Sequence, residues 1–179
     1  MNGEQSGASG TIGSVAELLV HALELEHEAA THYEGLADSM ASHHNAEVAA
    51  LFRRLARRSS ERAGDLADRA AGLQLPHIAP WSFKWNCPGN PSDPDCLHAE
   101  VGYRMRAVQA LRLAIHNERR SHAFYLQVAG SAGEPVVRQL AAELAAVQTE
   151  HLTWLADLLA REALTDRPLP EDLDPPQLP

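Results

Sequence analysis

Apolar residues recur along the chain at intervals of three and four, the spacing that places them on one face of an α-helix. The pattern predicts four long helices, over residues 14–40, 45–73, 104–129 and about 135–164. Ser14 stands where a helix N-cap is expected, and Pro135 falls in the first turn of the last helix. Ala, Leu, Glu and Arg dominate the composition, whereas β-branched and aromatic residues are few, so the chain favours an all-α fold.

The three connections between these helices differ in length. The first and third are short turns, but about 30 residues, 74–103, separate the second and third helices. This segment is too long for a hairpin turn and long enough to cross a bundle from end to end. We therefore predict a four-helix bundle with one long crossover at 14–164, a flexible N-terminus at 1–13 and a Pro-rich acidic tail at 165–179.

The two halves of the chain resemble each other. Ala22, Glu26, Tyr33 and Ala37 recur 92 residues later as Ala114, Glu118, Tyr125 and Ala129, and Leu51, Leu55 and Leu66 recur 89 residues later as Leu140, Leu144 and Leu155. A duplicated helical hairpin explains these matches, and chance in Ala- and Leu-rich helices is the alternative.

The charge and the hydropathy exclude some partners. A formal net charge of −9 argues against a nucleic-acid partner, because phosphate contacts need a basic face. We interpret Arg53, Arg54, Arg57 and Arg58 as a solvated helix face that pairs with acidic neighbours. The polar N-terminus lacks the pattern of a secretory signal, and no apolar run approaches membrane-spanning length. We expect a soluble, cytoplasmic protein with no nucleic-acid and no membrane partner.

The crossover contains two cysteines and a cluster of aromatic residues. Cys87 and Cys96 match no CxxC metal motif, so we interpret them as free thiols, with a disulfide as the alternative. Trp81, Phe83 and Trp85 can pin the segment to the bundle, either to close the core or to form an interface. A homodimer through the bundle or the crossover surface is the partner that we expect.

Polar residues interrupt the apolar face of every helix at a comparable depth. They are Glu26 in the first helix, Ser59 and Arg62 in the second, Glu118 in the third, and Gln148 and His151 in the fourth. A carboxylate in a core is costly unless a metal, a cation or hydrogen bonds compensate it. Four coincident interruptions therefore indicate one shared polar site. Histidines off the apolar face, His21 among them, are interpreted as surface residues.

These residues resemble the metal-binding pattern of the rubrerythrin-type branch of the ferritin-like superfamily. The resemblance covers residues 14–164 and implies a bundle that holds a di-iron carboxylate site. In that family the first and third helices each give a Glu, and the second and fourth each give a Glu-x-x-His pair. Glu26, Glu118 and His151 match this pattern, with a tyrosine seven residues after each glutamate. Two cysteines cannot build the rubredoxin-like module of full rubrerythrins.

Three of the six expected ligands differ in this chain. The second helix has Ser59 and Arg62 in place of its Glu-x-x-His pair, and the fourth has Gln148 in place of its glutamate. Glu61 and Glu150 lie one residue from useful positions, but that step turns a side chain about 100° around the helix. We therefore interpret the di-iron site of this chain as degenerate.

The charges determine which occupant suits the altered site. Two divalent ions would face only the carboxylates of Glu26 and Glu118 beside the permanent cation of Arg62, which leaves about +3 in the core. We therefore expect no metal, and an ion-pair cluster in which Arg62 contacts both glutamates. One Fe or Mn ion is the alternative, held by Glu118, His122 and His151.

On this basis we expect a non-catalytic bundle or a single-metal binder. The resemblance implies a different function, that of an active non-haem di-iron oxidoreductase acting on peroxide or Fe(II). Two Fe ions are thus a further alternative, although nothing in the second helix supports a second iron. The family pattern gives this site the ligands Glu26, Glu118, Gln148 and His151, with Tyr33 and Tyr125 as nearby donors.

Overall fold

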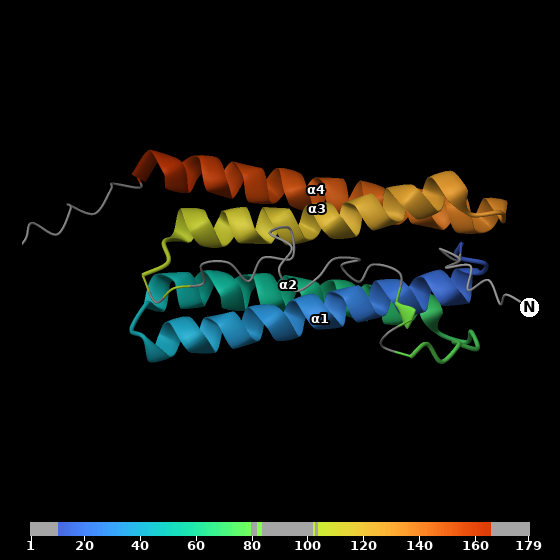
Figure 1. The fold of residues 1–179 in the computed structure, drawn as a ribbon, viewed down its shortest axis with the longest axis horizontal. Coiled ribbons are helices and arrows are strands. Elements are labelled where there is room, and N and C mark those ends of the chain that lie inside the picture. Colours follow the sequence, from blue (N-terminus) through green and yellow to red (C-terminus); the bar gives the residue numbers. More distant parts are fainter. Residues whose placement is uncertain (1–10, 80–81, 84–101, 103, 166–179) are drawn as a thin grey trace, which may run out of the picture.

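The computed structural model describes residues 11–79, 82–83, 102 and 104–165. Within these residues the chain forms four helices and no strand (Figure 1), namely α1 (Val15–Ser42), α2 (Ala46–Ala70), α3 (Ala107–Ser131) and α4 (Pro135–Thr165). Each observed helix end lies within three residues of the predicted one. The all-α four-helix bundle predicted from the periodicity is therefore confirmed.

Side-chain caps determine where the first two helices begin. The Ser14 hydroxyl accepts a hydrogen bond from the Glu17 backbone N–H at 3.1 Å, and the Asn45 side-chain oxygen accepts one from the Val48 N–H at 3.4 Å. Each bond satisfies a backbone donor that no carbonyl of the helix can reach. The N-cap expected at Ser14 is confirmed.

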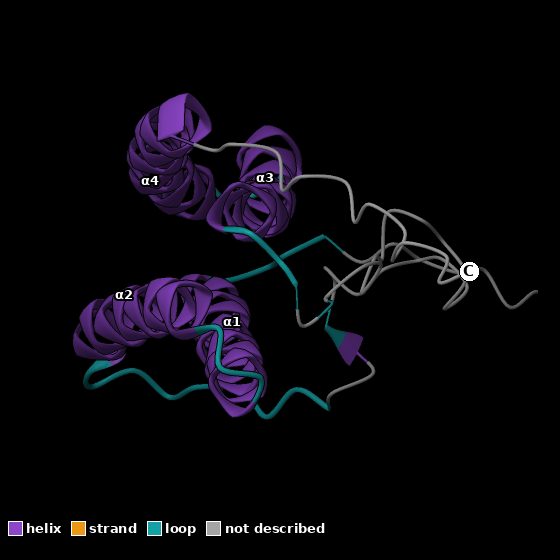
Figure 2. Cartoon of the chain, turned by 90° about the vertical axis from the view of Figure 1, so that its left-hand side faces the viewer, coloured by secondary structure: helices purple, strands orange, loops and turns teal. Residues whose placement is uncertain are grey.

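The helices pair as two hairpins, α1 with α2 and α3 with α4, which stack as two layers (Figure 2). Asn45, at the start of α2, donates to the carbonyl of Met105, just before α3, at 2.7 Å. Both helices therefore start at the same end of the bundle and run parallel. The chain that joins the end of α2 to the start of α3 must span the bundle, although most of 74–103 lies outside the described residues.

The core consists of two apolar clusters at opposite ends of the bundle. The cluster near the start of α1 includes Leu18, Leu19, Leu66, Phe124 and Val137. The cluster near the end of α1 includes Met40, Val48, Phe52, Leu111 and Leu155. Each draws on all four helices, so the polar residues at mid-length lie in a layer between two apolar blocks. None of the helices in the described residues has a stretch long and apolar enough to cross a membrane.

Part of the crossover packs onto the first of these clusters. Phe83 is buried, and its ring meets the ring of His21 edge-on with centroids 5.3 Å apart. His21 is itself fully buried, stacks on Phe124 and places Nδ1 2.9 Å from the carbonyl oxygen of Glu17. The expectation that His21 is a surface residue is therefore wrong, because His21 packs against Phe83 of the crossover and Phe124 of α3. Outside the described residues lie Trp81, Trp85, Cys87 and Cys96.

Candidate functional site

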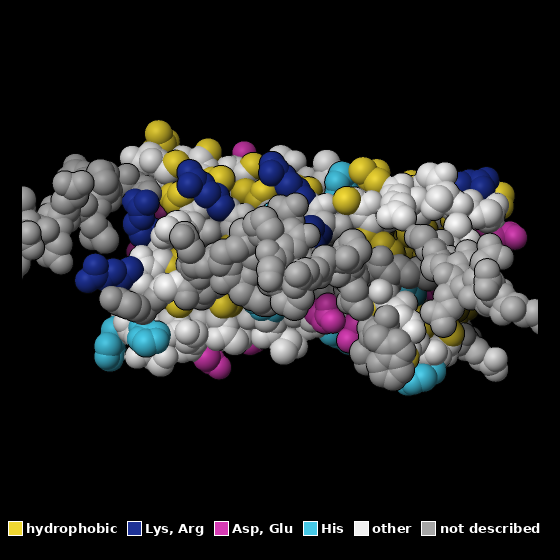
Figure 3. Space-filling model, viewed as in Figure 1, with side chains coloured by type: hydrophobic (Ala, Val, Ile, Leu, Met, Phe, Trp, Pro, Cys, Tyr) yellow, Lys and Arg dark blue, Asp and Glu magenta, His cyan; other side chains and the backbone are white. Residues whose placement is uncertain are grey.

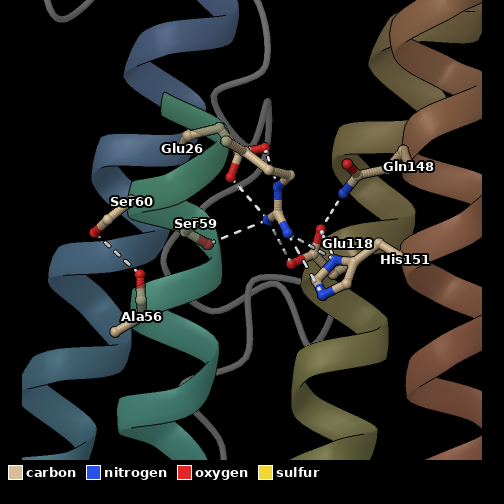
Figure 4. A network of polar contacts seen from close by, with 8 residues as sticks. Glu26, Ala56, Ser59, Ser60, Glu118, Gln148 and His151 are labelled. Carbon is tan, nitrogen blue, oxygen red and sulfur yellow. Dashed lines mark hydrogen bonds and ion pairs between the residues drawn. The ribbon is translucent and has the colours of Figure 1, made fainter. Parts of the chain in front are cut away.

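Polar side chains from all four helices meet in the layer between the two apolar clusters (Figure 4). They are Glu26 from α1, Ser59 and Arg62 from α2, Glu118 from α3, and Gln148 and His151 from α4. Glu26 is 5% exposed and Glu118 is 3% exposed, so both carboxylates are buried. Each one therefore needs partners within the protein.

The shortest contact between charged groups within this cluster is a bidentate ion pair between Arg62 and Glu26. Nε of Arg62 donates to one carboxylate oxygen of Glu26 and Nη2 donates to the other, each at 2.8 Å. Two parallel N–H···O bonds of this kind are among the stronger hydrogen bonds in proteins, because both partners are charged. The pair joins α1 to α2 through a partly buried cation.

The remaining N–H groups of Arg62 reach the other hairpin and the neighbouring turn of α2. Nη2 lies 3.3 Å from Oε1 of Glu118 and 3.2 Å from the hydroxyl of Ser59. Nη1 lies 3.0 Å from Nδ1 of His151. One guanidinium thus contacts residues of all four helices. It makes a bidentate contact with Glu26 but a single, longer contact with Glu118.

Glu118 obtains its other partners from α4. Its Oε2 accepts a hydrogen bond from Nε2 of Gln148 and lies 3.4 Å from Nδ1 of His151. The same ring nitrogen lies 3.0 Å from Arg62 Nη1. It can accept from the guanidinium or donate to the carboxylate, but it cannot do both. With Nδ1 protonated the ring donates to Glu118, and Nε2, which lies 3.4 Å from Nη1 of Arg62, can then accept from the guanidinium.

The two buried glutamates differ in their acidity. Burial raises the pKa of Glu26, and the hydrogen bonds and charge of Arg62 offset only part of this effect. Burial acts on Glu118 in the same direction, but the His151 hydrogen bond and the Arg62 charge outweigh it and hold the pKa of Glu118 below its usual range. The pKa of Arg62 is raised, because its contacts with Glu26 outweigh its burial. Arg62 is therefore a fixed cation, and Glu26 is the glutamate that is more easily protonated.

The other candidate ligands lie outside this cluster. His122 follows Glu118 by one turn of α3, and its Nε2 lies 3.1 Å from the hydroxyl of Thr149. Glu61 and Glu150 are exposed. Among the residues that the structure describes, no three His, Cys, Asp or Glu side chains are grouped so that they could hold a metal ion. The set predicted for one Fe or Mn ion, which needs His122, is therefore not assembled in this conformation.

An aromatic stack connects the cluster with two arginines of α2. The Trp154 ring stacks on the His151 ring with centroids 5.2 Å apart. The guanidinium carbons of Arg58 and Arg54 lie 4.0 and 4.7 Å from the centroid of Trp154, within the range of cation–π attraction. Two arginines of the helix face interpreted as solvated therefore also contact an aromatic ring, while Arg53 of the same face pairs with Asp38 at 3.6 Å. The available signal was the position of Trp154 one turn beyond His151, on the same side of α4.

Two cavities reach Arg62 from outside the cluster. One, of about 270 Å³, lies between α2 and α4 and is bordered by His151 and Trp154. The other, of about 80 Å³, is bordered by Glu26 and Tyr125. Burial raises the pKa of Tyr125 above its usual range, so its hydroxyl stays protonated at neutral pH. Water-sized molecules can therefore approach the guanidinium from two directions.

Together, the fold and the site define a class of protein, a four-helix bundle with a guanidinium–carboxylate cluster at its centre. Among solved structures, the chain is similar to an uncharacterized conserved protein from Magnetospirillum magnetotacticum MS-1. The two share 35% sequence identity and a TM-score of 0.63, over 87% of this chain and 98% of that one. The chain belongs to the family of this conserved protein. No protein-family model and no curated protein matches the chain.

Proposed function

We propose that the protein is a ferritin-like bundle of rubrerythrin type in which Arg62 has taken the place of the metal ions, and that this site is not catalytic. The observation that carries the proposal is the position of the Arg62 guanidinium, within 3.3 Å of oxygens of both Glu26 and Glu118. These two glutamates match iron ligands in the family that the sequence resembles. In this chain their oxygens accept hydrogen bonds from the guanidinium.

The charges of the cluster support an ion pair more than a di-iron site. Two carboxylates and one guanidinium sum to −1, which one proton on a carboxyl or on His151 neutralises. Two divalent ions would raise the sum to about +3 in a poorly solvated core. Gln148 also replaces a carboxylate ligand with an amide that donates to Glu118. The residues present therefore do not fit a pair of Fe ions.

A single-metal site is the second candidate, and one contact favours it. Nδ1 of His151 and Oε2 of Glu118 lie 3.4 Å apart, and an imidazole beside a carboxylate suits Fe(II), Mn or Zn. Nδ1 also lies 3.0 Å from Nη1 of Arg62, so an ion could bind there only after the guanidinium moves away. The ion-pair cluster is therefore the simpler occupant of the site.

Elemental analysis tests the proposal. The protein is expressed with added iron and manganese and is purified without a chelator. Less than about a tenth of a metal ion per chain supports the ion-pair cluster, since a site that binds tightly would retain its ion through purification. About one ion per chain would favour the single-metal site instead. About two ions per chain would overturn the charge argument and favour the oxidoreductase acting on peroxide or Fe(II).

A further inference from the structure

A groove along the seam of α3 and α4 is separate from the ion-pair cluster and has a volume of about 650 Å³. On α4 it is lined by apolar residues such as Leu152, Ala156 and Leu159, and on α3 it is bordered by Arg112 and Arg119. Figure 3 shows yellow apolar and dark-blue arginine side chains next to each other over these two helices. The groove therefore combines an apolar surface with a cationic edge.

The two arginines of this edge are available to an anionic partner. Both are exposed, and within the described part of the chain neither has a hydrogen-bond or ion-pair partner. They are seven residues apart on α3, which is two helical turns, so they lie on one face of the helix. At the rise of an α-helix their Cα atoms are separated by about 10.5 Å along its axis.

We propose that residues 166–179 of this chain, DRPLPEDLDPPQLP, occupy this groove as a polyproline II segment. Five of these residues are proline, which favours that conformation. With three residues per turn, Glu171 and Asp174 fall on one edge, about 9.3 Å apart. The opposite edges carry mainly leucine and proline. The segment thus presents two carboxylates at the spacing of the two groove arginines, together with an apolar surface for the floor.

The direction and length of the segment suit this placement. Ala163, which borders the groove, is in the last turn of α4, so the segment starts at one end of the groove. A segment that turns back there runs along α3 in the direction of that helix and meets Arg112 before Arg119. The groove from Ala163 to Leu152 spans about 17 Å along α4, whereas 14 residues in polyproline II span about 43 Å. Glu171 is therefore assigned to the first arginine and Asp174 to the second.

Thiol alkylation at the groove floor tests the proposal in the full chain. In an Ala156→Cys variant, the maleimide labelling rate at position 156 is followed by peptide mass spectrometry, which separates it from labelling at Cys87 and Cys96. Reversing both carboxylates (Glu171→Lys with Asp174→Lys) should raise this rate about five-fold or more, the change expected if the segment covers the groove at least four-fifths of the time. An Ala142→Cys variant, at an exposed α4 position that does not line the groove, should label at an unchanged rate.

A charge swap distinguishes ion pairing from a general effect of the substitutions. Adding Arg112→Glu and Arg119→Glu to the reversed segment should restore the slow labelling rate, because the pairs are re-formed with opposite polarity. Equal labelling rates with and without the carboxylate reversal would overturn the proposal. A charge-swapped variant that does not regain the slow labelling rate would also overturn it. Protection that increases with protein concentration would assign the groove to the segment of a second copy and would overturn the intramolecular assignment.

Discussion

The two hairpins of the bundle supply equivalent positions to one polar layer, but with different chemistry. Glu26 of α1 and Glu118 of α3 correspond to each other, 92 residues apart, and both are buried. Arg62 of α2 corresponds to His151 of α4, 89 residues apart. One hairpin therefore supplies a permanent cation and the other supplies an imidazole. Because all four helices share the layer, a single arginine changes the electrostatics of both halves.

The difference extends to the two glutamates, although they are the same residue type at equivalent depth. Glu26 receives both prongs of the guanidinium, and burial still raises its pKa. Glu118 receives one longer contact from Arg62 and further hydrogen bonds from α4, and its pKa is lowered. The number and type of partners, more than depth in the core, therefore determine how such a carboxyl titrates.

Removing the cation should have the largest effect. Arg62→Ala leaves two buried carboxylates without their counter-ion, so we expect a loss of about 3–5 kcal/mol in the free energy of unfolding. Urea denaturation in metal-free buffer measures it. Arg57→Ala, an exposed arginine of the same helix, is the matched control and should change the stability by less than about 0.5 kcal/mol. Equal stabilities for the two variants would contradict the structural role of Arg62.

Giving α2 and α4 the same Glu-x-x-His pair should enable the bundle to bind metal ions. The triple variant Ser59→Glu, Arg62→His and Gln148→Glu restores a Glu-x-x-His pair on α2 and on α4. Its four carboxylates would then balance the charge of two divalent ions, in place of the excess of about +3. We expect about two divalent ions per chain and a stabilisation of about 2.7 kcal/mol for each of the two sites at a metal concentration 100 times its Kd. Elemental analysis and thermal unfolding with and without Fe(II) or Mn check this. Arg62→His alone is the control, and metal binding by it equal to that of the triple variant would contradict the charge argument.

The two glutamates should respond to pH in opposite directions. The pKa of Glu118 lies below the ordinary value of 4.5, so the stability from its ionised form is present above that value and is lost as the pH falls through the folded-state pKa. The pKa of Glu26 lies above 4.5, so its contribution is fully present at low pH and is lost as the pH rises through the folded-state pKa.

Urea denaturation of Glu118→Gln and Glu26→Gln between about pH 7 and pH 3 tests this pair of predictions. As the pH falls, the stability of the wild type should approach that of Glu118→Gln from above. Over the same range, the wild type should gain stability relative to Glu26→Gln. The same trend for both variants would show that the two carboxyls have equivalent surroundings.

The smallest expected effect is that of the serine in the cluster. Ser59→Ala removes one hydrogen-bond acceptor of Arg62 Nη2, at 3.2 Å, so we expect a loss of about 1 kcal/mol in the free energy of unfolding. Ser60→Ala is the control, since the Ser60 hydroxyl is on the exposed side and donates only to the carbonyl of Ala56. A larger loss in the free energy of unfolding for Ser60→Ala than for Ser59→Ala would contradict the role of Ser59 in the cluster.

Several features of the site followed from the sequence, and others did not. The depth of Glu26, Glu118 and His151 could be predicted, because helical periodicity places residues on a face without reference to other helices. The burial of His21 could not, since it depends on a crossover residue more than sixty positions away in the chain. The position of His122 beside Thr149 depends likewise on how α3 packs against α4.

Caps and periodicity predicted the four helices, their ends and the meeting of polar residues at one level, because both act within a single helix. The sequence also predicts that the charges of this level do not suit two divalent ions. The sequence did not predict that both prongs of Arg62 face Glu26 or that Glu118 is held mainly from α4. The physical reason is that a long, rotatable side chain can reach several partners, and the packing of the other three helices determines which of them lie within hydrogen-bonding distance.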